Sequence, residues 1–377
     1  MPADKLTKKN SAKSVSGQKN ASGKTDSSGK KDSGAERIGM MLDDGLLICA
    51  PDGLILSANP AAVRLFQDSL TGLQIGDLIP AREMQQAFAG TSRTDRRLEF
   101  VWQRQTEITQ EFRIRIEQLD RQRIAILVLD MTLQQNLEKV RRDFVANVSH
   151  ELRSPLTTLA GFIETMLSTT ISEPETVTRF LGIMDEEAQR MKRLIDDLLS
   201  LSRVEAMEHI APQETVPLDK VVQAVVASLA GRAVQNDMQL QIQDDRPAGQ
   251  KEAPGSLIAG EADEMTEVFN NLVENAIKYG QPGSLVRVLL EQPEAGRIKV
   301  SIVNLGEGIE ARHLGRLTER FYRVDKARSR QLGGTGLGLA IVKHIVNKHR
   351  GQLGVSSEPG GETVFSVTLP LLAPQTV

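Results

Sequence analysis

The chain has 377 residues, of which 40% are hydrophobic and 25% are charged, as in folded proteins of two or three domains. Its formal net charge of −3 argues against a dedicated nucleic-acid-binding protein, because there is no basic field to attract phosphates. The single cysteine, Cys49, excludes a disulfide framework and any zinc site built on several thiolates, and it favours a reducing, cytoplasmic location.

Residues 1–35 are rich in lysine, serine and glycine and contain hardly any large apolar side chains. Such a segment cannot bury a core, so we expect a disordered tail. Its lysines could make weak peripheral contact with an acidic membrane surface, although a solubilising tail is the simpler interpretation. The tail lacks the apolar stretch of a signal peptide, and we find no run of about 20 apolar residues that would predict a membrane-spanning helix.

Residues 36–131 alternate between short apolar runs and turns, which predicts strands around a short helix at 59–66. The expected strands are 45–49, 54–57, 98–103, 111–116 and 124–129. This order, with the segment DGLILSANPAAVRLF, resembles a PAS sensor domain of the α/β class. No histidine precedes position 150, so a haem held by an axial histidine is not expected here, and Cys49 is interpreted as a small core residue.

Residues 132–209 show the apolar periodicity of two long helices. Four apolar residues follow one another at spacings of four, three and four: Leu133, Leu137, Val140 and Phe144. This spacing places them on one seam of a helix and predicts a coiled-coil linker that leads into a helical hairpin. A hairpin with so much apolar surface predicts pairing with a second copy into a four-helix bundle, hence a homodimer. Packing against the chain's own other domains is the alternative.

His150 lies on the first helix of this hairpin. Because Leu152 is two residues away on the apolar stripe, the imidazole stands about 200° around the helix from that stripe and should face solvent. The surrounding sequence, FVANVSHELRSPL at 144–156, closely resembles the phosphoacceptor box of sensor histidine kinases.

That resemblance implies that His150 accepts a phosphoryl group and that Glu151 is the general base. Ser154 is four residues from His150 and on the same face, where the family usually carries threonine or asparagine to orient the water that dephosphorylates the partner. Pro155 lacks a backbone donor and is expected to bend the helix just beyond the site.

Residues 214–372 mix helical and strand patterns and contain three further motifs. The first is EVFNNLVENAIKYG at 267–280. Asn271 and Asn275 are four residues apart, so both face the same side of a helix, where their side-chain oxygens can ligate Mg²⁺ directly or through water. Lys278 can reach phosphates, and Tyr279 can pack near a nucleotide base.

The second motif is VNLGEGI at 303–309, in which Gly306 and Gly308 allow the backbone to turn tightly against a nucleotide. Histidine kinases and the related gyrase, chaperone and mismatch-repair ATPases usually place an aspartate where Asn304 stands, and it accepts a hydrogen bond from the adenine amino group. A neutral amide accepts that bond more weakly, by about 1 kcal/mol or more, so weaker ATP binding is expected.

The third motif is GGTGLGL at 333–339, directly before a helical pattern. Glycines in this place expose backbone N–H groups and the positive end of a helix dipole to phosphates, as in an ATP lid. The expected contacts are Gly334, Thr335, Gly336, Leu337 and Gly338. Between the glycine motifs lies RFYR at 320–323. The resemblance implies that Arg323 contacts the γ-phosphate and that Phe321 and Tyr322 anchor the lid.

With these four motifs in this order, the chain is identified as a member of the sensor histidine kinases, most similar to the PhoR type of the phosphate regulon. The resemblance implies an α+β multidomain fold with a PAS domain, a dimeric helical hairpin and an α/β-sandwich ATP-binding domain. It also implies autophosphorylation of His150 from Mg-ATP and transfer to an aspartate of a PhoB-like response regulator. Two alternatives remain: an ATP-impaired, phosphatase-biased regulator or scaffold because of Asn304, and another ATPase of the same superfold.

Overall fold

The computed structural model describes residues 39–66, 69–89, 97–106, 109–168, 173–246, 256–325 and 332–372. The basic tail at 1–35, with its expected membrane contact, lies outside these residues. The chain divides into two compact units, Met1–Arg141 and Arg142–Val377, and each has its own core. No helix in the described part of the chain is apolar over a length that would cross a membrane.

The first unit is an antiparallel sheet of five strands in the order β2-β1-β5-β4-β3. Its strands are β1 (Gly45–Cys49), β2 (Ile55–Ala58), β3 (Arg97–Arg104), β4 (Gln110–Gln118) and β5 (Ile124–Asp130), and its helices are α2 (Pro60–Phe66), α3 (Ile75–Leu78) and α4 (Arg82–Ala89). Burial alternates along β1 and β4, because successive side chains point to opposite faces of a strand. One face of the sheet therefore builds the core.

Aromatic side chains fill part of this core. The ring centroids of Trp102 and Phe112 lie 5.5 Å apart, and those of Phe66 and Phe112 lie 6.2 Å apart. The Arg104 guanidinium covers both phenylalanine rings and donates a hydrogen bond to the Leu65 carbonyl. Cys49 is completely buried, and burial raises the pKa of its thiol to about 12. The cysteine is thus a core residue, as expected.

Asn59 connects three segments of this unit. Its Oδ1 accepts hydrogen bonds from the backbone N–H groups of Leu46 (2.9 Å) and Ala62 (2.8 Å), and its Nδ2 donates to the carbonyls of Gly39 and Asp44 (both 2.9 Å). The side chain is buried and uses its amide in full. It therefore caps α2 while fastening the chain segment that leads into β1.

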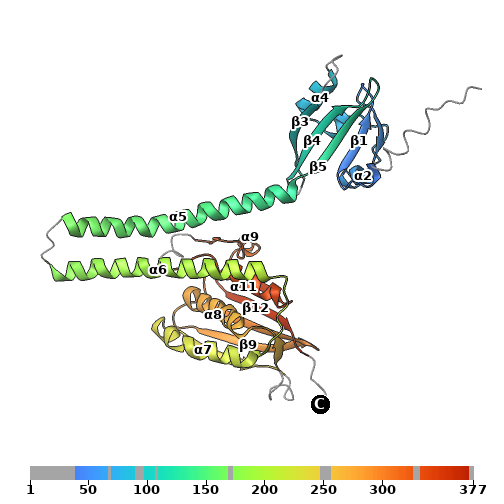
Figure 1. The fold of residues 1–377 in the computed structure, drawn as a ribbon. Coiled ribbons are helices and arrows are strands. Elements are labelled where there is room, and N and C mark those ends of the chain that lie inside the picture. The colour runs from blue at the N-terminus through green and yellow to red at the C-terminus, as the bar shows by residue number, and fades with distance from the viewer. Residues whose placement is uncertain are drawn as a thin grey trace, which may run out of the picture. The chain divides into compact units, whose positions relative to one another are not determined.

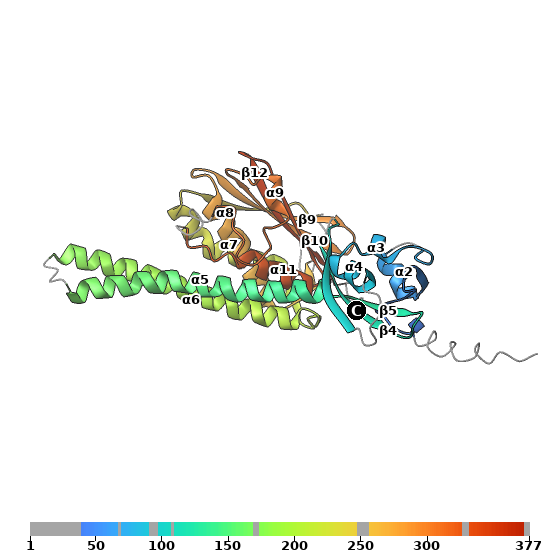
Figure 2. The same cartoon turned by 90° about the horizontal axis from the view of Figure 1, so that it is seen from above.

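The second unit begins within a long helix, α5 (Thr132–Ser168), which runs through Pro155 and is followed by α6 (Pro174–Met207). The two helices lie side by side as a hairpin (Figures 1 and 2), as the heptad-like spacing predicts. Near their connection the rings of Phe162 and Phe180 pack at 4.9 Å.

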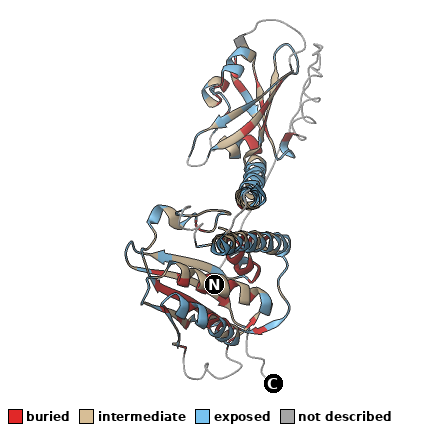
Figure 3. Ribbon diagram, turned by 90° about the vertical axis from the view of Figure 1, so that its left-hand side faces the viewer, coloured by how far each residue is buried: buried red, intermediate tan, exposed pale blue. Residues whose placement is uncertain are grey.

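The rest of the second unit, called the sandwich below, is a five-stranded sheet in the order β11-β12-β10-β9-β7, with a separate two-stranded sheet of β6 and β8. Its strands are β6 (Thr215–Pro217), β7 (Gln239–Asp244), β8 (Leu257–Ala259), β9 (Leu285–Glu294), β10 (Arg297–Leu305), β11 (Gln352–Ser357) and β12 (Glu362–Pro370). Its helices are α7 (Leu218–Gln235), α8 (Ala262–Tyr279), α9 (Ala311–Leu314) and α11 (Gly338–Lys348). Buried residues gather between helices and sheet (Figure 3), so the predicted helix-and-sheet architecture is confirmed.

Helix α6 shares this core. Its buried residues Leu194, Leu201 and Val204 belong to the same apolar cluster as those of the sandwich. Packing of the hairpin against the chain's own domain, the alternative considered from the sequence, is thus realised along part of α6. Other apolar side chains of the hairpin stay exposed, among them Leu156 and Leu199. Pairing with a second copy over that surface remains a prediction.

Candidate active site

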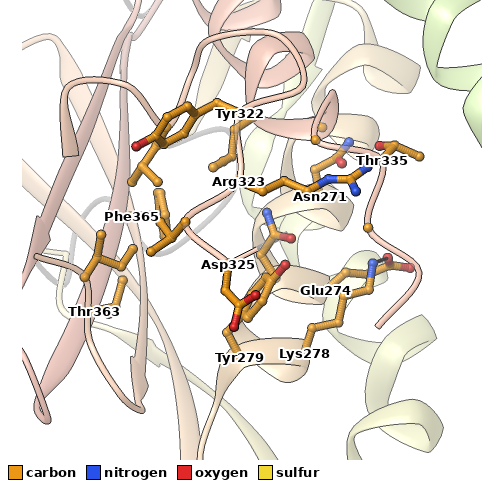
Figure 4. Close-up of a pocket in the computed structure, with 18 of the residues that line it drawn as sticks. Asn271, Glu274, Lys278, Tyr279, Tyr322, Arg323, Asp325, Thr335, Thr363 and Phe365 are labelled. Atoms are coloured by element: carbon orange, nitrogen blue, oxygen red, sulfur yellow. Dashed lines mark ion pairs between the residues drawn. The ribbon is translucent and has the colours of Figure 1, made fainter. Parts of the chain in front are cut away.

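A pocket of about 290 Å³ opens between α8, the loops that carry the glycine motifs, and β12. Most of the residues expected to bind nucleotide line it: Asn271, Asn275, Lys278, Tyr279, Asn304, Gly306, Gly308, Arg323, Gly334, Thr335, Gly336 and Gly338. Figure 4 shows several of these side chains converging from different elements. The structure therefore brings together motifs that are far apart in the sequence.

Helix α8 supplies the polar wall of the pocket because its two faces differ. Buried residues face the core, among them Leu272, Val273, Ala276 and Ile277. Four half-buried residues line the pocket: Asn271, Glu274, Asn275 and Lys278. Spacings of three and four place each set on one side of a helix. Lys278 forms an ion pair with Glu274 at 3.2 Å, which keeps its ammonium group at the pocket wall.

Asn271 and Asn275 offer amide oxygens of the kind that Mg²⁺ accepts in nucleotide sites. Asn271 Nδ2 donates to the Glu267 carbonyl (3.0 Å), which turns its Oδ1 toward Gly338 at the start of α11. A side chain at position 338 would collide with that oxygen. Among the described residues, no group of three histidine, cysteine or acidic side chains could hold a metal. A magnesium ion here would thus depend on the amide oxygens and on nucleotide phosphates.

The wall formed by β10 and β12 carries two neutral polar residues that are almost fully buried. Asn304 on β10 is 4% exposed, and Thr363, its partner in the register with β12, is 5% exposed. Gly308 follows with φ of +72°, and a Cβ there would collide with the carbonyl of Glu358. Glycine is required at position 308 on both counts.

The third glycine motif forms the edge of the pocket before α11. Phe321, with φ of +63°, donates its N–H to the Gly336 carbonyl at 2.8 Å. Leu337 does not line the pocket. Its side chain is completely buried in the core, and its N–H lies 3.3 Å from Thr335 Oγ1. The first N–H groups of α11 face this loop, where a helix terminus suits an anion.

His150 lies on α5 with its side chain exposed, and Glu151 and Ser154 are partly buried. None of these three lines the pocket. Glu151 Oε2 accepts hydrogen bonds from Arg190 of α6 (2.9 Å) and from Arg323 (3.3 Å). The side chain of Arg323 is 5% exposed, and the residue also lines the pocket. Its guanidinium therefore links the pocket to the residue next to His150.

Helix α6 forms another wall of the pocket through Arg193 and Asp197. Asp197 Oδ2 accepts a hydrogen bond from Thr335 at 2.5 Å. Burial raises the pKa of the Asp197 carboxyl, and the bond from Thr335 offsets only part of that effect. One turn on, Ser200 donates to Glu267 at 2.6 Å, and burial likewise raises the pKa of Glu267. Two carboxylates on facing helices are thus held in surroundings that favour the neutral form.

Sequence reasoning missed several lining residues, of which Thr363, Phe365, Arg193, Asp197 and Asp325 are examples. Thr363 and Phe365 lie on a strand whose pattern indicates only alternation of buried and exposed residues. Arg193 and Asp197 are four residues apart on a helix that the sequence marks only as part of a hairpin. Their spacing shows a shared face, but nothing in it shows that the face meets a pocket.

Two family models match the chain. Residues 140–206 match the His Kinase A (phospho-acceptor) domain, and residues 260–373 match the Histidine kinase-, DNA gyrase B-, and HSP90-like ATPase. His150 lies in the first match, and the pocket motifs of α8, β10 and α11 lie in the second.

Curated relatives and a solved structure are similar as well. The chain is 41% identical over 242 residues to the phosphate regulon sensor protein PhoR of Pseudomonas aeruginosa, covering 64% of this chain and 52% of that protein. It is 34% identical over 265 residues to the sensor protein SrrB of Staphylococcus aureus, covering 70% of this chain and 44% of that protein. The chain thus spans about half the length of these relatives. A crystal structure of histidine kinase ThkA in complex with response regulator protein TrrA is 20% identical, with a TM-score of 0.49, over 88% of this chain and 97% of that one.

Proposed function

Because the chain carries both matched domains and thereby belongs to the sensor histidine kinases, we propose that it phosphorylates its own His150 from ATP and passes the phosphoryl group to an aspartate of a response regulator. The observation that carries this proposal is the contact of Arg323 with Glu151. It joins a pocket suited to a nucleotide to the residue that follows the exposed histidine.

In the proposed reaction, a nitrogen of His150 attacks the γ-phosphorus of ATP in line with the bond to ADP, which breaks as the new P–N bond forms. Glu151 accepts the proton that the imidazole must give up, after Arg323 has turned from its carboxylate to the phosphates. Lys278 and Arg323 neutralise charge on the phosphoryl oxygens. Asn271 and Asn275, together with the nucleotide phosphates, would hold a magnesium ion, which would supply further neutralisation.

The phosphoryl group then moves from His150 to the aspartate of the regulator. In the opposing activity, Ser154 orients the water that hydrolyses the phosphoaspartate of the regulator and releases inorganic phosphate. The identity to a phosphate regulon sensor protein supports a role in phosphate signalling with a PhoB-like regulator. The exposed apolar side chains of the hairpin, such as Leu156 and Leu199, support a homodimer, because a second hairpin would cover them.

A second candidate is a phosphatase-biased regulator or scaffold that no longer uses ATP. The observation in its favour is that Asn304, on the wall formed by β10 and β12, is neutral. Nucleotide titration of the full chain separates the two candidates. The kinase requires ATP to bind at cellular concentrations, whereas the scaffold predicts an affinity far weaker than that.

The kinase is tested by incubating the full chain with γ-labelled ATP and Mg²⁺. We expect acid-labile, base-stable label on the wild type and none on His150→Gln. His209→Gln is the matched control, because His209 is also exposed but lies beyond the end of α6, and it should retain the label. Label that persists in His150→Gln, or a wild type that never acquires it, contradicts the proposal.

A further inference from the structure

The amide of Asn304 is a polar group on the pocket wall that has no hydrogen-bond partner in the described part of the chain. It is 4% exposed and lines the pocket, and no group in the described part of the chain hydrogen-bonds to its side chain. Its Nδ2 faces the space that a side chain at Gly306 would fill. A ligand that excludes water from this wall must complete the hydrogen bonds of the amide, because leaving it unpaired would be unfavourable. The amide is therefore placed to contact whatever enters the pocket at this wall.

An amide can recognise two kinds of purine edge, whereas a carboxylate can recognise one. A 6-aminopurine presents an N–H donor at position 6 and an acceptor at N1. A 6-oxopurine presents an acceptor at position 6 and an N–H donor at N1. The Asn304 side chain meets the first with Oδ1 and, after half a turn about its last bond, the second with Nδ2. An ionised carboxylate only accepts, so it would repel the oxygen of a 6-oxopurine.

Thr363, opposite Asn304 in the strand register, has the same dual capacity. Its Oγ1 lies 2.7 Å from Ser357 Oγ, and either hydroxyl can be the donor. Ser357 Oγ also accepts the Ile309 N–H at 2.9 Å. When Ser357 donates, the Thr363 proton is free for the N1 acceptor of a 6-aminopurine. When Thr363 donates, its oxygen is free for the N1 donor of a 6-oxopurine.

We propose that this pocket accepts 6-oxopurine nucleotides as well as adenine nucleotides, with Asn304 as the residue that determines this selectivity. The inference rests on the proposed nucleotide-binding function and deepens it by widening the substrate class. Neither purine leaves a mismatched polar atom at Asn304 or Thr363. The usual source of discrimination, a buried donor facing a donor or an acceptor facing an acceptor, is therefore absent at these two described residues.

The experiment is a titration of the full chain, with Mg²⁺, by ADP and by inosine diphosphate. These nucleotides differ only in the purine edge at positions 6 and 1, and neither can donate a γ-phosphoryl group. We expect the two dissociation constants of the wild type to agree within about threefold. In Asn304→Asp we expect a preference for ADP of about tenfold or more, since the mismatch costs the free energy of a buried hydrogen bond.

Asn304→Ala serves as a second variant, because it removes both hydrogen-bonding capacities without favouring either purine. It should weaken both nucleotides and leave their ratio near that of the wild type. A wild type that binds ADP but prefers it tenfold or more over inosine diphosphate overturns the inference and leaves the proposed kinase intact. An Asn304→Asp variant with an unchanged ratio also overturns it. A wild type that binds neither nucleotide overturns both proposals.

Discussion

The guanidinium of Arg323 lies 3.3 Å from the carboxylate of Glu151, so one side chain contacts both the pocket and the neighbour of His150. Arg190 shares the same carboxylate oxygen at 2.9 Å. Nucleotide phosphates entering the pocket would compete with Glu151 for Arg323, while Arg190 stays in place. A phosphate would thus replace the Glu151 carboxylate as a partner of this guanidinium, whose Nε is buried without a hydrogen-bond partner among the described residues.

Replacement of Arg323 tests this relationship. Arg323→Gln removes a charge-assisted hydrogen bond worth about 1.5–3 kcal/mol, so the initial rate of His150 phosphorylation should fall by about 10- to 150-fold. The rate is measured as label incorporated from γ-labelled ATP. Arg312→Gln is the control, because Arg312 is 71% exposed and outside the pocket. A wild-type rate in Arg323→Gln would contradict the proposed role.

Protonation of Asp197 should make stability depend on pH. Burial raises the pKa of its carboxyl group in the native protein, so the native form holds the proton more tightly than the unfolded chain. The associated stability is fully present below the ordinary carboxyl value of about 3.9 and is lost as pH rises through the raised native value. Asp197→Asn keeps an acceptor for Thr335 and removes this loss.

We therefore expect Asp197→Asn to raise Tm at pH 8 by on the order of 2–4 °C, which corresponds to about 1 kcal/mol in a unit of this size. The gain should shrink as the pH is lowered toward 4. Thermal unfolding of the full chain at several pH values measures it. Asp185→Asn, at an exposed position about three turns earlier on the same helix, should show no such trend. A gain that is independent of pH would refute the assigned cause.

Asn59 should be essential for the stability of the first unit. Asn59→Ala removes four hydrogen bonds and should lower the free energy of unfolding by about 2–4 kcal/mol. Trp102 is the single tryptophan of the chain and packs in this core, so its fluorescence during urea unfolding reports on this unit. Asn136→Ala, on the exposed surface of α5, should change little. Equal effects of the two substitutions would disprove the role of Asn59.

Cys49 should be chemically inert in the native protein. With a thiol pKa of about 12, the reactive thiolate is a minute fraction at pH 8, and the side chain is completely buried. Alkylation by iodoacetamide at pH 8 should be negligible until denaturant is added, and one thiol per chain should then react. Rapid alkylation without denaturant would show that the first unit opens readily.

Local spacing in the sequence was sufficient to predict the hairpin and the faces of α8. A period of 3.6 residues fixes which side chains share a helical face, so Asn271 and Asn275 could be grouped in advance. Asp197 and Thr363 could not be assigned to the pocket in advance, because their places in it depend on tertiary packing. β12 lies beside β10 although about 60 residues separate Asn304 from Thr363, and no local pattern encodes that pairing. Leu337 was expected at the pocket within a glycine-rich motif, but the core takes up its side chain.

The hydrogen bond between Asp197 of α6 and Thr335 beside the pocket gives the long hairpin helix a share in nucleotide affinity. Any displacement of α6 that separates these residues alters how tightly a nucleotide is held. By thermodynamic reciprocity, a bound nucleotide must bias the position of α6 by the same factor. In the proposed kinase, information can therefore travel in both directions along this helix, between the nucleotide and whatever displaces α6.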